Sequence, residues 1–484
     1  MKKGLLLAIP LIMGCACYGE DVTISFQGAT AFVTQNTKDS VSVTVDGARV
    51  SIESLYQGRK LTLRLTGESD DGRLTLKTAG KAIVTLDGLK LTSQEGAPIE
   101  LKNKKKVEVT TEKGTENTLT ITACTDTANH KAAVIWAKDK LLLSGKGLLN
   151  VVATGDGCRG IKTKKDITIQ DVTLNVTTSG NNLGVKPNQF PGGFPGEFPG
   201  DSIKPGGFSG GFPGGEMPAP GKFPGFPGDS IKSGGFPSLP GDSTMQGGFP
   251  GKQKYVASTK GIASKGKITI NGGTVTVRTS TPGAEGIEGK QGIVFGGGTV
   301  DVFSLDDAIN ANATIEFNGA HVTARSKGND AVDANPEGGF FPPIGGNGMK
   351  IEPAIIIRDG TVYAWSQVGP PEEGLDSDMA PLAIEGGTVF TVGGFIGDMP
   401  SVPTNETAKQ PTALLVGLDI AKDEPLTISD ASGKIIDTVT VPFNFRGSAS
   451  IVTTPVFKLG NAYTVKTKGY EKTFTLTDPF TVVR

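Results

Sequence analysis

The sequence predicts an all-β protein, wound as a right-handed, single-stranded parallel β-helix with three short strands per coil and a cap at both ends. Three observations predict it: a repeat of 22 to 25 residues, aliphatic residues at fixed positions within each repeat, and no convincing amphipathic helix. Val, Ile, Thr and Leu dominate the ordered stretches and 69 of 484 residues are Gly, which indicates many short strands separated by turns.

The repeat is anchored by one aliphatic residue in each unit. This landmark stands at Ile135, Ile161, Ile262, Ile287, Ile309, Val332 and Leu375. From the third to the sixth landmark the intervals are 25, 22 and 23 residues, and the longer gaps contain insertions. Further apolar residues follow six, eight and thirteen positions later, as Ile268, Ile270 and Val275 follow Ile262. Each unit therefore offers three alternating segments, with Gly-rich turns such as Gly272–Gly273 between the second and third.

One such coil cannot bury its own apolar face, so coils must stack and pair their strands in parallel. The crossover rule makes right-handed winding the expectation. A propeller blade or a sandwich domain needs more residues than one unit supplies. Stacking therefore explains the repeat better than either alternative.

Three motifs carry a resemblance to a known family. They are Gly-Thr-Glu-Asn-Thr-Leu-Thr at 114–120, Lys260 to Lys265 followed by Ile268 to Val275, and Asp307-Ala-Ile-Asn310. These segments resemble the bacterial carbohydrate-binding-domain-containing β-helix family over roughly residues 70 to 400, and weakly near Ser450 to Val465. The resemblance implies a pectate-lyase-like architecture that binds polysaccharide and calcium without an established lyase activity.

The N-terminus predicts export. Residues 1–20 contain two lysines and then an apolar run from Leu5 to Met13, which is a signal peptide and too short for a membrane anchor. Ile12-Met13-Gly14-Cys15 has the form of a lipobox, so we expect a lipid on Cys15 and a cell-envelope lipoprotein, in the periplasm or on the outer surface. The alternative is cleavage near Gly19 and ordinary secretion.

The remaining boundaries follow from changes in pattern. Residues 21–95 are expected to form an N-terminal β cap, residues 96–400 the β-helix, and residues 408–484 a C-terminal β cap or small β domain. Residues 187–252 repeat Phe-Pro-Gly and predict a mobile insertion within the β-helix. Whether Cys124 and Cys158 form a disulfide stays open, since export permits one.

Outward positions carry charges that change sign along the repeat. Small residues beside the landmark, such as Gly160 and Gly261, are expected to face inward, which turns the positions two before and one after it outward. The early outward residues, Arg159 and Lys162, are basic, and the later ones are acidic. Because stacked strands lie about 4.8 Å apart, like charges on adjacent coils become close neighbours.

Such an acidic strip either binds a cation or stays a solvated charged face. Carboxylate and amide oxygens at this spacing suit Ca²⁺ better than Zn²⁺ or Mg²⁺. The expected calcium ligands are Glu285, Asp306, Asp307, Asn310, Asp330 and Asp333.

The sequence favours a non-catalytic carbohydrate-binding protein over an enzyme. The expected sugar-binding residues are Trp136, Arg159, Lys162, Glu288, Arg325 and Trp365, with the two tryptophans as stacking platforms. The acidic coils would take an acidic, calcium-bridged polysaccharide. A net charge of -1 gives no reason to expect nucleic acid, and a membrane is expected only through the lipid on Cys15.

Two alternatives remain. A polysaccharide lyase would need a base within reach of the calcium cluster, and Arg159 and Lys162 stand at least three coils from it, although Arg325 is closer. A surface adhesin or structural spacer would bind protein or nothing. The identity of the glycan and the oligomeric state do not follow from the sequence.

Overall fold

The computed structural model describes residues 21–37, 40–125, 131–185, 255–336, 352–368, 372–377, 380–394 and 401–484. All regular structure in these ranges is β-strand, so the prediction of an all-β protein is confirmed. The ranges contain no helix, and hence none that could cross a membrane. The predicted signal peptide with Cys15 and the predicted insertion at 187–252 lie outside the described residues.

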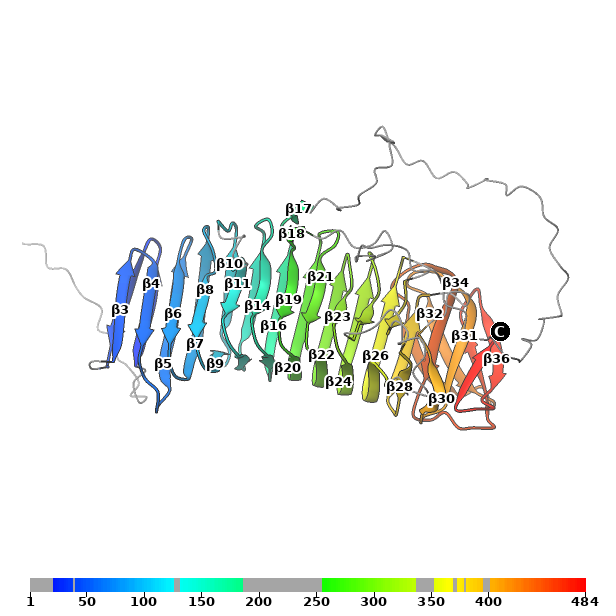
Figure 1. Ribbon diagram of the computed structural model, residues 1–484. Helices are drawn as coiled ribbons and strands as arrows, with labels where there is room; N and C mark the ends of the chain where they lie inside the picture. Colours follow the sequence, from blue (N-terminus) through cyan, green and yellow to red (C-terminus); the bar gives the residue numbers. More distant parts are fainter. Residues whose placement is uncertain are drawn as a thin grey trace, which may run out of the picture. The chain divides into compact units, whose positions relative to one another are not determined.

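A sheet of eleven strands forms what we call the first column, in which each strand pairs with the equivalent strand of the next repeat (Figure 1). Its strands, in order along the sheet, are β3 (Val41–Asp46), β4 (Arg49–Ser54), β6 (Arg73–Thr78), β8 (Ile99–Asn103), β11 (Ala133–Ala137), β14 (Arg159–Thr163), β19 (Lys260–Ser264), β21 (Glu285–Gly289), β23 (Ile309–Ala311), β25 (Val332–Ala334) and β27 (Leu375–Asp376). All pairings from β4 onward are parallel, and they place the landmark residues side by side, as Ile262 opposite Ile287. The predicted register is therefore confirmed for this segment of each unit.

A larger sheet of twenty strands supplies two further columns of parallel strands. The second column comprises β5 (Leu61–Ser69), β7 (Ala82–Ser93), β9 (Val107–Thr111), β12 (Leu141–Gly145), β15 (Ile167–Ile169), β20 (Ile268–Thr279), β22 (Ile293–Ser304), β24 (Ile315–Ser326), β26 (Ile355–Ser366), β28 (Leu382–Ile384) and β30 (Pro403–Ala408). The third comprises β10 (Glu116–Ile121), β13 (Leu148–Ala153), β16 (Val172–Thr178), the second halves of β7, β20, β22, β24 and β26, and β29 (Thr388–Val392).

The Gly-rich positions do not form the turns that the sequence predicts. Five strands of twelve residues, β7, β20, β22, β24 and β26, run through both columns without a separate turn. The register shifts after Ile270 and again after Asn271, and Gly273 adopts φ of 82° there, which a residue with a Cβ rarely does. An irregularity within one strand thus replaces the predicted turn between two strands.

The two ends are built from antiparallel pairings. At the start, β1 (Val22–Gln27) and β2 (Thr30–Gln35) form one hairpin and β3 and β4 another. The parallel ladders already include β4 and β5, so the segment 21–95 holds strands in the repeat register as well as the hairpins.

The C-terminal segment has its own sheet. β31 (Thr412–Ile420), β34 (Phe445–Thr453) and β37 (Phe480–Val483) extend the large sheet, whereas β32 (Pro425–Asp430), β33 (Ile435–Thr440), β35 (Ala462–Lys466) and β36 (Glu471–Thr475) form an antiparallel sheet of four. A short antiparallel ladder joins β17 (Leu183–Val185) to β18 (Tyr255–Ala257), on either side of the predicted insertion.

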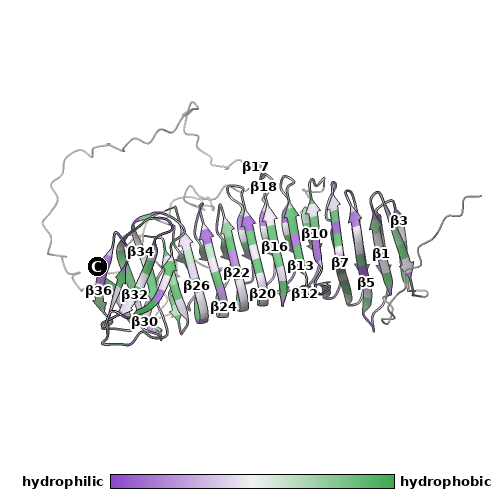
Figure 2. Cartoon of the chain, turned by 180° about the vertical axis from the view of Figure 1, so that it is seen from behind, coloured by the Kyte–Doolittle hydropathy of each residue, from purple (hydrophilic) through white to green (hydrophobic). Residues whose placement is uncertain are grey.

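The core runs along the inside of the three columns. Apolar and polar residues alternate along the strands, which Figure 2 displays as green and pale or purple bands. The small residues beside the landmarks are buried, as predicted: a Cβ added at Gly261 would lie 2.3 Å from Cγ1 of Val277 and 2.5 Å from the carbonyl oxygen of Gly286. This close approach explains why the repeat carries glycine there.

Replacing that glycine should therefore destabilise the stack. We expect Gly261→Val to lower the free energy of unfolding by about 1–3 kcal/mol, because the added atoms overlap backbone of the next coil. Thr276→Val, at a half-buried outward position of the same coil, is the matched control and should change stability little. Chemical denaturation of the three proteins measures the difference, and equal stabilities would contradict this packing.

Candidate functional site

The first column aligns one outward position of each coil into a ladder. Through the pairing of neighbouring strands, this ladder reads Glu100, Trp136, Lys162, Ala263, Glu288, Asn310, Asp333 and Asp376. Because adjacent strands lie about 4.8 Å apart, each side chain has the next as its neighbour. In this row Glu100 stands first, Lys162 is the basic residue, and Glu288, Asp333 and Asp376 follow on the later strands.

A cavity of about 500 Å³ opens on the basic part of this row. Its lining comprises Arg159, Lys162, Thr163, Lys260, Ala263, Ser264, Lys265, Glu288, Lys290 and Asn312. These residues come from β14, β19 and β21 and the turns that follow β19, β21 and β23. Five basic side chains and a single carboxylate line the cavity, which gives it the electrostatics of an anion-binding site. Its volume is that of a small-molecule site.

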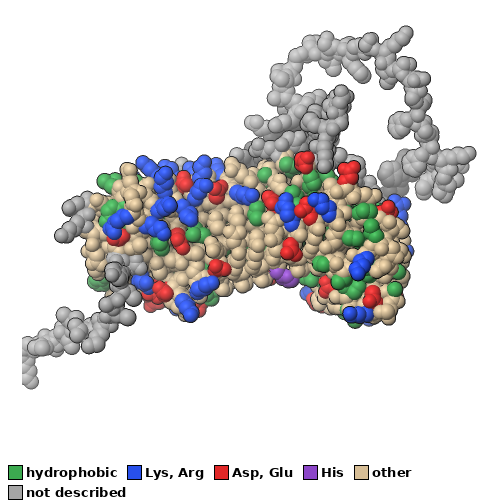
Figure 3. Space-filling model, turned by 90° about the horizontal axis from the view of Figure 1, so that it is seen from below, with side chains coloured by type: hydrophobic (Ala, Val, Ile, Leu, Met, Phe, Trp, Pro, Cys, Tyr) green, Lys and Arg blue, Asp and Glu red, His purple; other side chains and the backbone are tan. Residues whose placement is uncertain are grey.

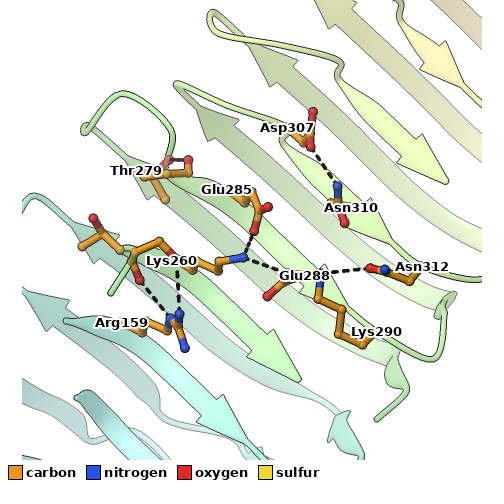
Figure 4. Close-up of polar contacts among 12 residues, drawn as sticks. Arg159, Lys260, Thr279, Glu285, Glu288, Lys290, Asp307, Asn310 and Asn312 are labelled. Atoms are coloured by element: carbon orange, nitrogen blue, oxygen red, sulfur yellow. Dashed lines mark hydrogen bonds and ion pairs between the residues drawn. The ribbon is translucent and has the colours of Figure 1, made fainter. Parts of the chain in front are cut away.

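Ion pairs fix part of the lining. The Nζ atom of Lys260 pairs with the carboxylates of Glu285 and Glu288, at 2.7 Å from Oε1 of Glu288 (Figure 4). Lys290 lies 2.5 Å from the same Oε1 and donates a hydrogen bond of 2.9 Å to Oδ1 of Asn312. Arg159 donates from Nε to the carbonyl oxygen of Ser258 at 2.9 Å. These pairs hold Glu288 and the two lysines in place.

Burial and neighbouring charges shift the pKa of Glu288 and Lys260 in opposite directions, and that of Lys162 in the same direction. Burial alone would raise the pKa of Glu288, but the ammonium groups of Lys260 and Lys290 outweigh it and lower that pKa to about 2. Burial acts to lower the pKa of Lys260, and Glu285 and Glu288 outweigh it and raise that pKa. For Lys162, burial and the neighbouring charges of Arg159 and Lys265 act together and lower the pKa to about 6.

An acidic group lies further along the same column. Asp307, Asp330 and Asp333 are buried, and one carboxylate oxygen from each lies within 4.8 Å of the other two. Asn310 donates from Nδ2 to Oδ2 of Asp307 at 2.8 Å and to Oδ2 of Asp333 at 3.0 Å. We call these three aspartates the aspartate triad.

The next coil adds to this group. Asp376 stands opposite Asp333 in β27, and Glu373 donates from its backbone nitrogen to Oδ1 of Asp330 at 2.5 Å. Burial, followed by the charges of Asp376, Asp307 and Asp333, raises the pKa of Asp330 well above its usual range. Burial and the charge of Asp376 raise the pKa of Glu373 to about 8. A cation would relieve this repulsion.

Two of the six expected calcium ligands lie outside the triad and Asn310. Glu285 stands directly opposite Lys260 in the register, and its carboxylate pairs with the ammonium group of that lysine. Asp306 is half-buried, and its backbone carbonyl accepts hydrogen bonds from the hydroxyls of Ser304 and Ser326. Neither carboxylate belongs to the group formed by Asp307, Asp330 and Asp333.

The two expected stacking platforms are also wrong. Trp136 is 3% exposed and packs with Ala97 and Ala133, with the amines of Lys131 and Lys164 each 5.9 Å from its ring centroid. Trp365 is 2% exposed and packs against Phe445, within the second apolar core of the C-terminal segment. Neither indole presents a face on which a sugar could stack.

Arg325 lies away from the cavity and the triad. Arg325 lies in the second half of β24, in the third column, where its guanidinium pairs with the carboxylate of Asp301. Arg278 pairs with the same carboxylate at 2.5 Å. The carboxylates of the acidic coils lie on the first column, whereas Arg325 lies in the third. Arg159, Lys162 and Glu288, by contrast, line one cavity.

Four contributors to the site were not among the predicted residues. Lys260, Lys265 and Lys290 line the cavity, and Asp376 extends the acidic group. All four occupy outward positions that the register of the repeat identifies, so the signal that could have found them is present in the sequence. Figure 3 shows many further Lys and Arg side chains gathered over the N-terminal coils.

The two cysteines of the described chain face each other as thiols. Cys158 is buried and Cys124 half-buried, and neither is in a disulfide. A side-chain hydrogen bond with Cys124, together with burial, raises the pKa of Cys158.

Comparisons with known proteins agree with the motif-based resemblance. Residues 46–189 and 245–334 match the model of a family described as carbohydrate-binding domain-containing protein. A protein of that description from Acetivibrio thermocellus is 31% identical over 139 residues, which are 27% of this chain and 48% of the relative. The chain thus spans about half the length of this relative.

A solved structure also matches. It is the gadolinium derivative of the polysaccharide lyase-like protein from C. thermocellum, with a TM-score of 0.41 and 18% identity over 66% of this chain and 95% of the other. The support for the resemblance to the carbohydrate-binding family comes from the matched residues 46–189 and 245–334 and from the relative of that description.

Proposed function

We propose that this chain is an exported, non-catalytic protein that binds an acidic polysaccharide along the first column. The observation that supports this most is a cavity lined by five basic side chains on the same column as the aspartate triad. Both lie in a segment that matches a carbohydrate-binding family. The cations would pair with sugar carboxylates. The proposal also places the chain in the cell envelope through a lipid on Cys15, as the sequence motif suggests.

The proposed scaffold is a right-handed, single-stranded β-helix. Its support is that the chain passes through the three columns in turn and pairs in parallel with each preceding pass. Right-handed crossover between parallel strands is the strongly preferred arrangement. A rigid scaffold of this kind would hold the cations at a regular spacing along a sugar chain.

Calcium fits the donor set of the aspartate triad. Two oxygens on one Ca²⁺ ion at 2.3–2.6 Å lie at most about 5.2 Å apart, and the triad oxygens satisfy this limit. Asp307, Asp330 and Asp333 would hold the ion, with Asp376 as a further carboxylate nearby. When bound, the ion would supply positive charge that lets an acidic sugar approach the acidic coils.

Cleavage of the polysaccharide by a lyase reaction is the less favoured hypothesis. Elimination beside a calcium ion needs a base that reaches the sugar held by that ion. Lys162 stands in β14, three strands from β23, which at about 4.8 Å a step places it about 14 Å from the nearer side of the triad. This separation supports binding without cleavage.

We expect calcium to raise the unfolding temperature through the triad. A ligand that binds only the folded state stabilises it by mass action, about 2.7 kcal/mol at a hundredfold excess over Kd. Thermal melts with calcium and with chelator should differ for the unaltered chain and for Asp70→Asn at an exposed position. The difference should vanish in Asp330→Asn. A calcium shift that survives this substitution would place the ion elsewhere.

We expect polygalacturonate to bind and to stay intact. Lys265 is exposed at the cavity, so Lys265→Glu should weaken binding about tenfold by repulsion, whereas Lys113→Glu in a distant exposed turn should not. Titration calorimetry measures affinity, and ultraviolet absorbance reports unsaturated product. Tighter binding of a neutral glucan would overturn the acidic class, and a rise in absorbance would favour the lyase.

A further inference from the structure

The cavity contains one buried amine, that of Lys162, which takes part in none of the ion pairs described above. Lys260 and Lys290 pair with carboxylates, and Arg159 donates to Ser258. Lys162 is 5% exposed and lines the same cavity, and among the described residues none lies within hydrogen-bond or ion-pair distance of its ammonium group. A buried lysine without a counter-ion is a costly arrangement that polysaccharide binding does not require.

The surroundings of Lys162 explain its protonation state. In the register, Trp136 stands on one side of it and Ala263 on the other, and neither offers a charge. Arg159 on its own strand and Lys260 and Lys265 on and after β19 repel a proton, while Glu288 on β21 alone attracts one. Glu288 is already shared by Lys260 and Lys290. The amine is therefore held mainly in its neutral form at pH 7, since its pKa is about 6.

We propose that Lys162 is a nucleophilic amine that captures anionic carbonyl compounds, namely aldehydes or 2-keto acids bearing a carboxylate or phosphate, as imines within this cavity. Desolvation and neighbouring cations are the two means by which proteins make a lysine amine nucleophilic, and both act here. Lys265 and Arg159 are the charges that would hold the anionic group of the compound. The open-chain reducing end of an acidic sugar belongs to this class.

The chemistry balances without a further reactant. The lone pair of Nζ attacks the carbonyl carbon, the carbonyl oxygen takes a proton to give a carbinolamine, and loss of water leaves the imine. Hydrolysis reverses the sequence. The inference uses the same cavity as the proposed function, but it does not depend on polysaccharide binding and has a separate readout.

The test uses the full chain with pyridoxal 5′-phosphate as anionic aldehyde and cyanoborohydride as reductant, which converts the imine to a stable secondary amine. At pH 7 about nine-tenths of an amine with a pKa of 6 is neutral, against fewer than about one in a thousand for an exposed lysine. We expect Lys162 to be labelled at least about tenfold faster than Lys113, as measured by peptide mass mapping. The rate should fall as pH drops below 6. Pyridoxal, which lacks the phosphate, should react at least about fivefold more slowly.

Variants separate this inference from a structural role. Lys162→Ala should lose the fast label, and Lys113→Ala should keep it. Because the folded state binds fewer protons than the unfolded state between about pH 6 and the ordinary lysine pKa of about 10.4, stability should rise with pH over that window. Lys162→Met should flatten this rise and melt higher at pH 7, which also shows that the variant folds.

Three results would overturn the inference. They are labelling of Lys162 no faster than of Lys113, labelling that begins only above about pH 9, and equal rates with pyridoxal and its phosphate. The first two contradict the neutral amine, and the third contradicts the anionic class. Each of these three results would overturn the inference whether or not polygalacturonate binds.

Discussion

The parallel pairing of each coil with the next is the constraint on which the rest of the structure depends. It places equivalent residues of successive repeats about 4.8 Å apart in unbroken rows. Inside, the rows of Ile, Val, Leu and glycine pack into one continuous core. Outside, the same register makes every charged residue a neighbour of its counterpart in the next coil, so the charges of the first column cannot be independent.

The charged residues of the first column meet that constraint in two ways. Where the sign alternates, as from Lys260 to Glu285 and Glu288, ion pairs neutralise the charges and fix the side chains. Where the sign repeats, as in Asp307, Asp330 and Asp333, repulsion and burial raise the pKa of Asp330. Lys162 among cations is the basic counterpart. Where like charges are not paired with opposite ones, a bound cation or anion would add most to the stability of the fold.

Periodicity predicted the inward positions well because they depend on local spacing alone. Ile262 and Ile287 pair as expected, and Gly261 is packed against the next coil. The burial and partners of the outward residues were harder to predict, because they depend on side chains from other coils that the spacing within one repeat does not specify. Trp136 occupies an outward position yet is buried, and Glu285 lies opposite Lys260 instead of joining the acidic group. Arg325 is close to the acidic residues in sequence, but its strand, β24, places it in the third column.

A crystal structure with calcium and an oligogalacturonate would test the central claim most directly, namely that the first column is the binding surface. The account predicts an anomalous calcium peak between Asp307, Asp330 and Asp333, together with sugar density whose carboxylates meet Lys265 and Arg159 at the cavity. Sugar density confined to another column or to the C-terminal sheet, with the cavity and the triad empty, would contradict it.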